Sequence, residues 1–244
     1  MRLLALDTAT EQMAVGIADG DYSAVVNAEG GARASETLIP VAMDLLARRG
    51  LKPADLDAIA FGQGPGAFTG LRTAVSVTQG LAYGIGCPVL PIDSLMIVAE
   101  DARAQALGTE AGLPFELWVA MDARMGEVYA AAYRHDGAEW HTQTPPALLD
   151  LAGLAARWQS PNCTPAHLAG SAIEAFAGRL PWGGAVLWPT VADRAAALLR
   201  LARQAFATGR GVPAQSALPL YLRDKVALTT AEREAQRAAN GSRS

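Results

Sequence analysis

The sequence predicts an α/β protein built from two similar halves, each a mixed β-sheet flanked by helices. Short apolar runs typical of strands alternate with longer helical patterns along the chain. The order of elements is three strands, then helix, strand, helix, strand and helix, and it recurs after a linker at Gly108–Pro114. In both halves a strand enters a small-residue turn that opens a helix, at Ile59–Gly66 and at His167–Ser171. An internal duplication explains all three observations.

The first half opens with three expected strands. The apolar run Arg2–Leu6 ends in the polar turn Asp7–Thr10. Met13–Ala18 and Tyr22–Ala28 flank Asp19–Asp21, a sequence typical of a tight hairpin. We therefore expect the second and third strands to pair as a hairpin.

The first helix is expected from Ser35, whose side chain can cap it, to Arg49, with Gly50 as its stop. Pro40 must kink this helix or delay its start. The apolar residues form two stripes, which together exceed the roughly 100° that one core contact requires. These stripes are Leu38, Val41, Ala42 and Leu45, and Ile39, Met43 and Leu46. A second apolar partner is indicated, although the sequence leaves open which stripe meets the core.

The second helix, which follows a glycine loop and starts near Phe68, is the most informative segment. One side is an ordinary core stripe, whereas the other carries a single charge, Arg72. Ser76, Gly80 and Gly84 repeat every four residues and form a ridge of small side chains. Such a ridge lets another helix approach closely. Two interpretations are open: a helix buried within its own domain, or a partner interface.

The remaining elements complete the repeated pattern. A strand and a helix end the first half, at Pro88–Ile92 and from Asp93 or Ser94 to about Ala106. The second half is expected to contain strands Leu117–Asp122 and Glu127–Tyr133, a helix Ala147–Trp158, a strand at His167, a strand Gly184–Trp188 and a helix Ala192–Phe206. The expected domains are 1–108 and 115–208, followed by a returning segment at 209–228 and a disordered tail at 229–244.

Length, composition, net charge and cysteine count restrict the class of protein. With 51% hydrophobic and 18% charged residues, the 244-residue chain can form a sizeable core. A net charge of -4 argues against independent nucleic-acid binding. Two cysteines, Cys87 and Cys163, are too few for a disulfide framework or a cysteine-based zinc site. The apolar N-terminal run is short and Asp7 ends it, so we expect no signal peptide, no membrane association and a cytoplasmic location.

Two loops could carry chemistry. Asp7 with Thr8, and Asp122 with Arg124 in the second half, could face each other as a phosphate or magnesium clamp. Alternatively, each aspartate only caps its turn. The loop at Gly64 and Gly66 could present N–H groups to an anion, or could be a tight turn that lets strand and helix pack.

No catalytic or metal-binding cluster is evident. His135, His141 and His167 lack metal-binding spacing, and we expect His135 and His141 at surface turns. The segment from Asp122 to Glu127 could be a catalytic cluster or a salt-bridged hairpin. Catalytic residues and metal ligands are therefore both assigned as none.

Four motifs together resemble the TsaB (YeaZ) family, the dimerisation subunit of the bacterial tRNA threonylcarbamoyladenosine machinery. They extend from residue 4 to residue 223, and the second is the most specific. Departures are Ala67, where the family usually has Ser, Thr73, where it often has Ile, and the absence of histidine in Arg33–Glu36. The motifs are Leu4–Thr10, Gly64–Arg72, Asp122–Met125 with Glu127–Tyr129, and Pro219–Arg223.

The resemblance implies a duplicated actin/Hsp70/sugar-kinase-like (ASKHA) fold and a subunit without chemistry of its own. Its partners would be a TsaD-like paralogue and a TsaE-like ATPase, with tRNA contacted only through the complex. It would form a homodimer when alone, and ATP or ADP could bind at the subunit boundary. The expected interface is Ile39, Met43, Leu46, Thr73, Ser76, Val77, Gly80 and Gly84. Asp7, Thr8, Gly64, Gly66, Asp122 and Arg124 would then be vestigial nucleotide loops.

Two alternatives belong to other classes. An independent ATP-dependent small-molecule kinase or ATPase of the same fold would use Asp7 and Asp122 at its cleft. A metallopeptidase would need the histidine ligands that the first helix, Ser35–Arg49, lacks.

Overall fold

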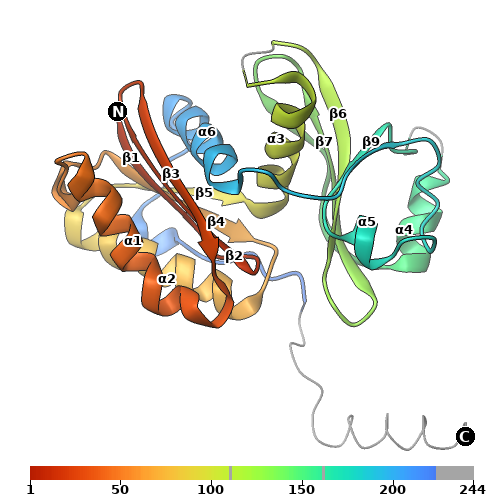
Figure 1. The fold of residues 1–244 in the computed structure, drawn as a ribbon, viewed down its shortest axis with the longest axis horizontal. Coiled ribbons are helices and arrows are strands. Elements are labelled where there is room, and N and C mark those ends of the chain that lie inside the picture. Colours follow the sequence, from red (N-terminus) through yellow and green to blue (C-terminus); the bar gives the residue numbers. More distant parts are fainter. Residues whose placement is uncertain (110–111, 161–162, 224–244) are drawn as a thin grey trace, which may run out of the picture.

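The computed structural model describes residues 1–109, 112–160 and 163–223 (Figure 1). The first half contains β1 (Arg2–Asp7), β2 (Gln12–Asp19), β3 (Tyr22–Glu29), α1 (Ala34–Arg48), β4 (Ala58–Gly64), α2 (Phe68–Ile85), β5 (Val89–Asp93) and α3 (Ser94–Leu107). The second half contains β6 (Phe115–Asp122), β7 (Glu127–His135), β8 (Trp140–Asp150), α4 (Leu151–Trp158), β9 (His167–Ala169), α5 (Ala172–Ala175), β10 (Val186–Trp188) and α6 (Arg194–Ala207).

The two sheets have the same topology. The first has the strand order β3-β2-β1-β4-β5 and the second has β10-β9-β6-β7-β8, which is the same order in equivalent strands. In each, the first three strands pair antiparallel and the last two pair parallel. The predicted duplication and the mixed α/β class are therefore confirmed, and two such halves are what the resemblance implied.

Five layers alternate through the molecule (Figure 1). α1 and α2 cover the outer face of the first sheet, α4 and α5 that of the second, and α3 and α6 lie between the sheets. Strand alternation supplies both faces: Leu3 and Ala5 of β1 join the central core, whereas Leu4 and Leu6 pack under α1 and α2. A third core forms around Trp158 beneath α4. Every α-helix therefore packs one side against a sheet.

The last helix crosses from one half to the other. Although α6 falls in the 115–208 segment, it packs on the first sheet, where Leu199 meets Gly16 of β2. Arg203 donates hydrogen bonds to the carbonyl oxygens of Gly20 and Tyr22 in the β2–β3 hairpin. The last helix of the expected 115–208 domain thus packs on the first half, and the domain boundaries stay a prediction. The expected tail at 229–244, and the end of the returning segment, lie outside the described residues.

The predicted helix Ala147–Trp158 begins too early. Residues 147–150 belong to β8, a strand that the sequence analysis missed, and α4 begins at Leu151. β8 is an edge strand, and its register with β7 shifts between Thr144 and Ala147, so neither Pro145 nor Pro146 pairs with a residue of β7. The Asp150 carboxylate accepts a hydrogen bond from the Gly153 N–H at 2.7 Å, so it caps α4 and sets the start of the helix.

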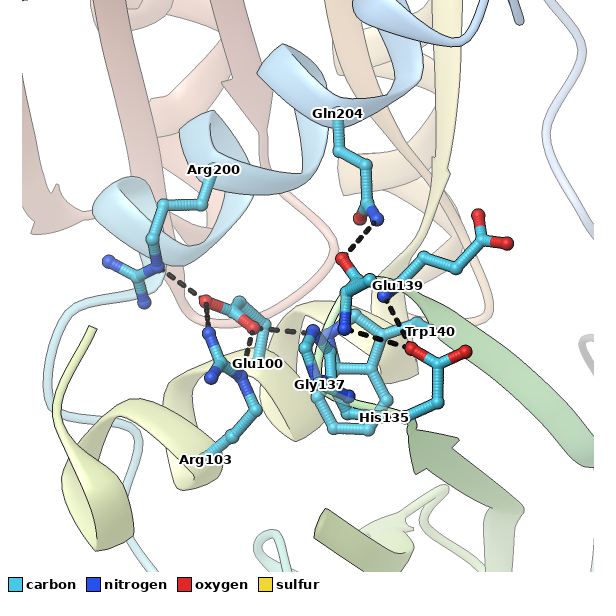
Figure 2. A network of polar contacts seen from close by, with 10 residues as sticks. Glu100, Arg103, His135, Gly137, Glu139, Trp140, Arg200 and Gln204 are labelled. Atoms are coloured by element: carbon cyan, nitrogen blue, oxygen red, sulfur yellow. Dashed lines mark hydrogen bonds and ion pairs between the residues drawn. The ribbon is translucent and has the colours of Figure 1, made fainter. Parts of the chain in front are cut away.

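A buried polar network joins α3 to α6 and to β8 (Figure 2). The Glu100 carboxylate accepts hydrogen bonds from Arg103, from Arg200 of α6 and from the Trp140 indole. His135 packs edge-on against Trp140 and is buried, so its expected place at a surface turn is wrong. Burial alone would raise the pKa of Glu100, but hydrogen bonds from Arg103 and Arg200 outweigh it and the pKa is lowered. The ionised carboxylate thus stabilises the layer between the sheets.

We expect Glu100→Gln to lower the free energy of unfolding by about 1–3 kcal/mol at neutral pH, because Arg103 and Arg200 lose their charged acceptor. A depressed carboxyl pKa stabilises the fold fully above the ordinary pKa, about 4.3, and this stabilisation is lost as pH falls through the folded pKa. Urea unfolding from pH 3 to 7 should show the difference from the unmodified protein shrinking below about pH 4. Glu139→Gln, in an exposed pair with Arg210, is the control. If the stability difference between Glu100→Gln and the unmodified protein did not change with pH, the stabilising role of the ionised Glu100 carboxylate would be contradicted.

Candidate functional site

A cleft of about 670 Å³ lies between the two halves. Its walls come from the glycine loop and the start of α2 in the first half, and from the β6–β7 turn in the second. The first residue of α6, Arg194, and the returning residues 220–223 line it as well. The cleft therefore lies where the two predicted phosphate loops were expected to meet.

The side chains of Asp7 and Thr8 make contacts within this chain. Asp7 is fully buried, and its Oδ2 accepts a hydrogen bond from Arg194 Nε at 2.5 Å. Thr8 is buried as well, and its hydroxyl donates to the Gly70 carbonyl oxygen at 2.6 Å. Neither residue lines the cleft. The chain's own groups satisfy both side chains, and their assignment as a vestigial nucleotide loop stays a prediction.

The glycine loop is a tight packing turn. The Gly64 N–H donates to the Ser94 hydroxyl, and the Ala67 N–H donates to the Ala9 carbonyl oxygen. Gly64 has a φ of 113°, and a Cβ on Gly66 would lie 2.5 Å from the Ala9 oxygen. Pro65, the residue between them, has no N–H. These contacts favour the second of the two alternatives, a tight packing turn, and the assignment of Gly64 and Gly66 to a nucleotide loop stays a prediction.

The β6–β7 turn connects the halves across the cleft. The Arg124 guanidinium lies 2.6 Å from Glu11 of the first half and 3.5 Å from Asp122 of its own hairpin. The Arg124 N–H also donates to Asp122 Oδ1, so this aspartate caps its turn. Glu127 instead pairs with Arg223 at 2.5 Å. The segment is thus a hairpin with one internal ion pair, between Asp122 and Arg124. Two further ion pairs join it to Glu11 and to Arg223, which are distant in the sequence.

Residues 218–223 form a segment that we name the strap, and four of them, 220–223, line the cleft. The Leu220 N–H donates to the Gln63 carbonyl oxygen in β4. Tyr221 stacks near Phe68 at 5.0 Å between ring centroids, and its hydroxyl accepts from Arg72 Nε at 2.9 Å. Only the fourth motif of the resemblance, Pro219–Arg223, indicated this segment. The strap therefore ties α2 to the second half through Arg223.

Of the expected interface residues, Ile39, Ser76, Gly80 and Gly84 are exposed, Met43, Thr73 and Val77 are half-buried, and one is buried. Leu46 is buried in the core beneath α1, so its assignment to the interface is wrong. At 100° per residue Leu46 points to nearly the same side of the helix as Ile39, so periodicity does not separate the two, and only the packing of Leu46 in the core shows that it is buried. The other residues, together with Tyr83, define what we name the α1–α2 face: Ile39, Met43, Thr73, Ser76, Val77, Gly80, Tyr83 and Gly84. On this face Ile39 is 43% exposed and Tyr83 79%.

Glycines on α2 fall into two kinds. A Cβ on Gly70 would lie 1.8 Å from the Thr8 carbonyl oxygen, so the fold requires glycine there. A Cβ on Gly80 or Gly84 would meet no atom within 4 Å. Each helical glycine costs roughly 1 kcal/mol relative to alanine. Gly80 and Gly84 therefore have no close packing neighbour within the described part of the chain.

Across residues 1–109, 112–160 and 163–223, no group of three or more His, Cys, Asp or Glu side chains could hold a metal ion. No helix within those described ranges is long and apolar enough to cross a membrane.

Comparisons with known proteins find a TsaD sequence model and relatives named TsaB or YeaZ. The sequence model described as "TsaD: tRNA N6-adenosine threonylcarbamoyltransferase" matches residues 23–177. The tRNA threonylcarbamoyladenosine biosynthesis protein TsaB of Escherichia coli (strain K12) is 34% identical over 241 residues, which are 93% of this chain and 96% of that protein. TsaB of Haemophilus influenzae is 37% identical over 129 residues, 53% of this chain and 52% of that one. The structure of YeaZ from Pseudomonas aeruginosa has a TM-score of 0.77 at 36% identity, covering 91% of this chain and 99% of its own.

Proposed function

Since the chain belongs to the TsaB (YeaZ) family of tRNA threonylcarbamoyladenosine biosynthesis proteins, we propose that it acts in that pathway as a non-catalytic subunit. The subunit binds and activates a TsaD-like threonylcarbamoyltransferase, which modifies an adenosine of tRNA next to the anticodon. The α1–α2 face carries this proposal. It is exposed and nearly uncharged, and the partner docks on it.

Two features of the face support a protein partner. Ile39 and Tyr83 keep large apolar surface in water, and Gly80 and Gly84 give up helix stability without an intramolecular benefit. Both costs are recovered when a second helix pair packs closely on the ridge and buries these side chains. A stable interface of this kind buries about 800 Å² on each partner. The short α5 of the second half offers no comparable surface.

The cleft supports the non-catalytic assignment in one respect. The buried Arg194 guanidinium forms an ion pair with the carboxylate of Asp7. A kinase or ATPase of this fold would need that carboxylate for its metal. We propose that nucleotide and catalysis belong to the partners, with ATP or ADP at the subunit boundary and a TsaE-like ATPase joining the pair. tRNA is contacted through the complex in the cytoplasm, and the chain alone forms a homodimer through the same face.

We expect Gly80→Arg to abolish co-purification with the TsaD-like partner while leaving the chain folded. An arginine at this position projects from the ridge and prevents close helix approach, whereas the free helix gains propensity. Affinity-tagged chain expressed in the source cell, followed by identification of the captured protein, measures the first effect. Thermal unfolding measures the second, which should show no loss of stability.

Ala177→Arg is the matched control, because Ala177 is exposed on the second half, outside both the α1–α2 face and the cleft. It should retain the partner. Equal capture by Gly80→Arg and by the unmodified chain would remove the α1–α2 face from the proposal. Size-exclusion chromatography with light scattering tests the homodimer in the same variants.

A further inference from the structure

Arg72 begins the ridge of small side chains on α2 and is the only charged residue of that helix. The ridge continues at intervals of four residues through Ser76, Gly80 and Gly84, so the four positions form one row. Arg72 is exposed and lies next to the α1–α2 face. A partner helix that packs along the ridge therefore passes over Arg72 as well as over Gly80.

Two aromatic side chains hold the Arg72 guanidinium in place. Its Cζ lies 3.9 Å from the ring centroid of Phe68, one turn earlier in α2, and 6.0 Å from the ring centroid of Tyr221 in the strap. Arg72 Nε donates a hydrogen bond to the Tyr221 hydroxyl at 2.9 Å. The two rings also pack on each other, with 5.0 Å between their centroids. The strap thus helps to fix a side chain of a type that is usually flexible at a protein surface.

The terminal nitrogens of Arg72 are available to a partner. The hydrogen bond to Tyr221 uses Nε, and neither Nη group makes a hydrogen bond within the described residues. No carboxylate of the described residues lies at ion-pair distance from Arg72, whereas the exposed Arg48 of α1 pairs with Asp44 at 2.7 Å. The described part of the chain therefore orients the Arg72 cation without neutralising it.

A carboxylate is the group that best matches this guanidinium. Arginine presents parallel N–H donors that fit both oxygens of a carboxylate, and a side chain that is already oriented loses less freedom on binding. Phosphate oxygens have similar chemistry, but binding of a nucleic acid requires several cations along its backbone. The exposed side of α2 offers one cation among uncharged residues, and the net charge of the chain is -4. A single acidic side chain on an otherwise apolar protein surface fits this arrangement better.

We infer that Arg72 binds a carboxylate of the docked partner, an aspartate or glutamate on the helix that packs along the ridge. This inference rests on the proposed function, because it requires a partner on the α1–α2 face. Phe68 and Tyr221 are positioning residues, which act through Arg72. An ion pair at one end of the ridge sets the register of the partner helix, which a row of small side chains specifies only weakly.

The TsaD-like partner, purified after its capture by the unmodified chain, is the probe. Its dissociation constant with the full chain is measured at salt concentrations of about 50 and 300 mM, because salt screens an exposed ion pair. Arg72→Gln should weaken binding about tenfold or more at the lower salt and remove most of the salt dependence. Arg72→Lys keeps the charge but lacks the planar fork, so it should weaken binding less and retain the salt dependence.

Arg179→Gln is the matched control. Arg179 is also exposed and lies over an aromatic ring, with its Cζ 5.4 Å from the Phe176 centroid, but it belongs to the second half. This variant should bind the partner as tightly as the unmodified chain does. Thermal unfolding should show that both glutamine variants remain folded.

Tyr221→Phe tests the positioning by the strap, since it keeps the ring and removes the hydroxyl that binds Arg72. It should weaken binding about threefold in the unmodified chain and have no further effect in the Arg72→Gln background. An equal loss in both backgrounds would show that Tyr221 does not act through Arg72.

Substitution of each exposed glutamate and aspartate of the partner by its amide locates the carboxylate. One of these substitutions should weaken binding of the unmodified chain about tenfold and have no further effect with Arg72→Gln. The inference is overturned if Arg72→Gln binds like Arg179→Gln, or if no partner carboxylate couples to Arg72. Capture that survives Gly80→Arg would instead remove the docking face, so the two failures can be told apart.

Discussion

Arg194→Ala should destabilise the protein by about 3–5 kcal/mol, because it leaves a buried carboxylate without its counter-charge. The Asp7 and Arg194 side chains are 0% and 2% exposed, so water cannot replace the lost partner. Nη2 of the same guanidinium contacts the Ser94 carbonyl oxygen at 3.4 Å, and this weak hydrogen bond disappears as well. The variant therefore weakens the junction of β1, α3 and α6 at the centre of the molecule.

Thermal unfolding measures this effect. At about 2–4 °C per kcal/mol for a chain of this size, the expected decrease in Tm is roughly 6–20 °C. Arg210→Ala is the control: its pair with Glu139 is exposed, and its loss should cost less than about 1 kcal/mol. The double variant Asp7→Asn, Arg194→Met should recover much of the stability, because no unpaired charge remains. A single variant as stable as the Arg210 control would show that the pair is unimportant.

Gly70→Ala should be at least as damaging, with a loss of about 3 kcal/mol or more and a low soluble yield. The added Cβ would lie 1.8 Å from the Thr8 carbonyl oxygen. The backbone of Gly70 packs directly against the backbone of Thr8. The Thr8 hydroxyl also donates a hydrogen bond to the Gly70 carbonyl oxygen, so neither the turn after β1 nor the start of α2 can move without losing this bond. The substitution pushes the start of α2 away from the first sheet.

Gly80→Ala is the matched control in the same helix. Its Cβ enters open space, so the variant should gain about 0.5–1 kcal/mol from helix propensity. Urea unfolding of the two variants therefore compares the same chemical change with opposite expected signs. Equal effects at positions 70 and 80 would refute the distinction between structural and surface glycines on α2.

Local patterns were sufficient for most of the fold. Period-2 and period-3.6 apolar patterns located the strands and helices of the first half, and their repetition predicted the duplicated sheets that the topology confirms. The missed strand β8 has a local cause, because Pro145 and Pro146 weaken a strand pattern and Leu148 to Leu154 suits a helix. Pairing with β7 decides between the two conformations there.

One part of the candidate site could likewise be predicted from the sequence, and another part could not. The unusual outer side of α2 was visible in the sequence, because periodicity assigns residues to sides of a helix. Its use as a docking surface stays a prediction. Which stripe of α1 faces outward could not be read locally: Ile39 and Leu46 look alike in the sequence, and only the contact with the sheet separates them.

By itself, the sequence determined the α/β class, the duplication and the α2 ridge, since each depends on the spacing of neighbouring residues. Only the tertiary structure decided what Asp7 does. Its partner, Arg194, lies 187 positions away and comes from a helix that crosses onto the opposite half. The physical reason is that an ion pair depends on the distance between two charges in space. The local sequence pattern does not specify that distance, because only folding brings the two segments together.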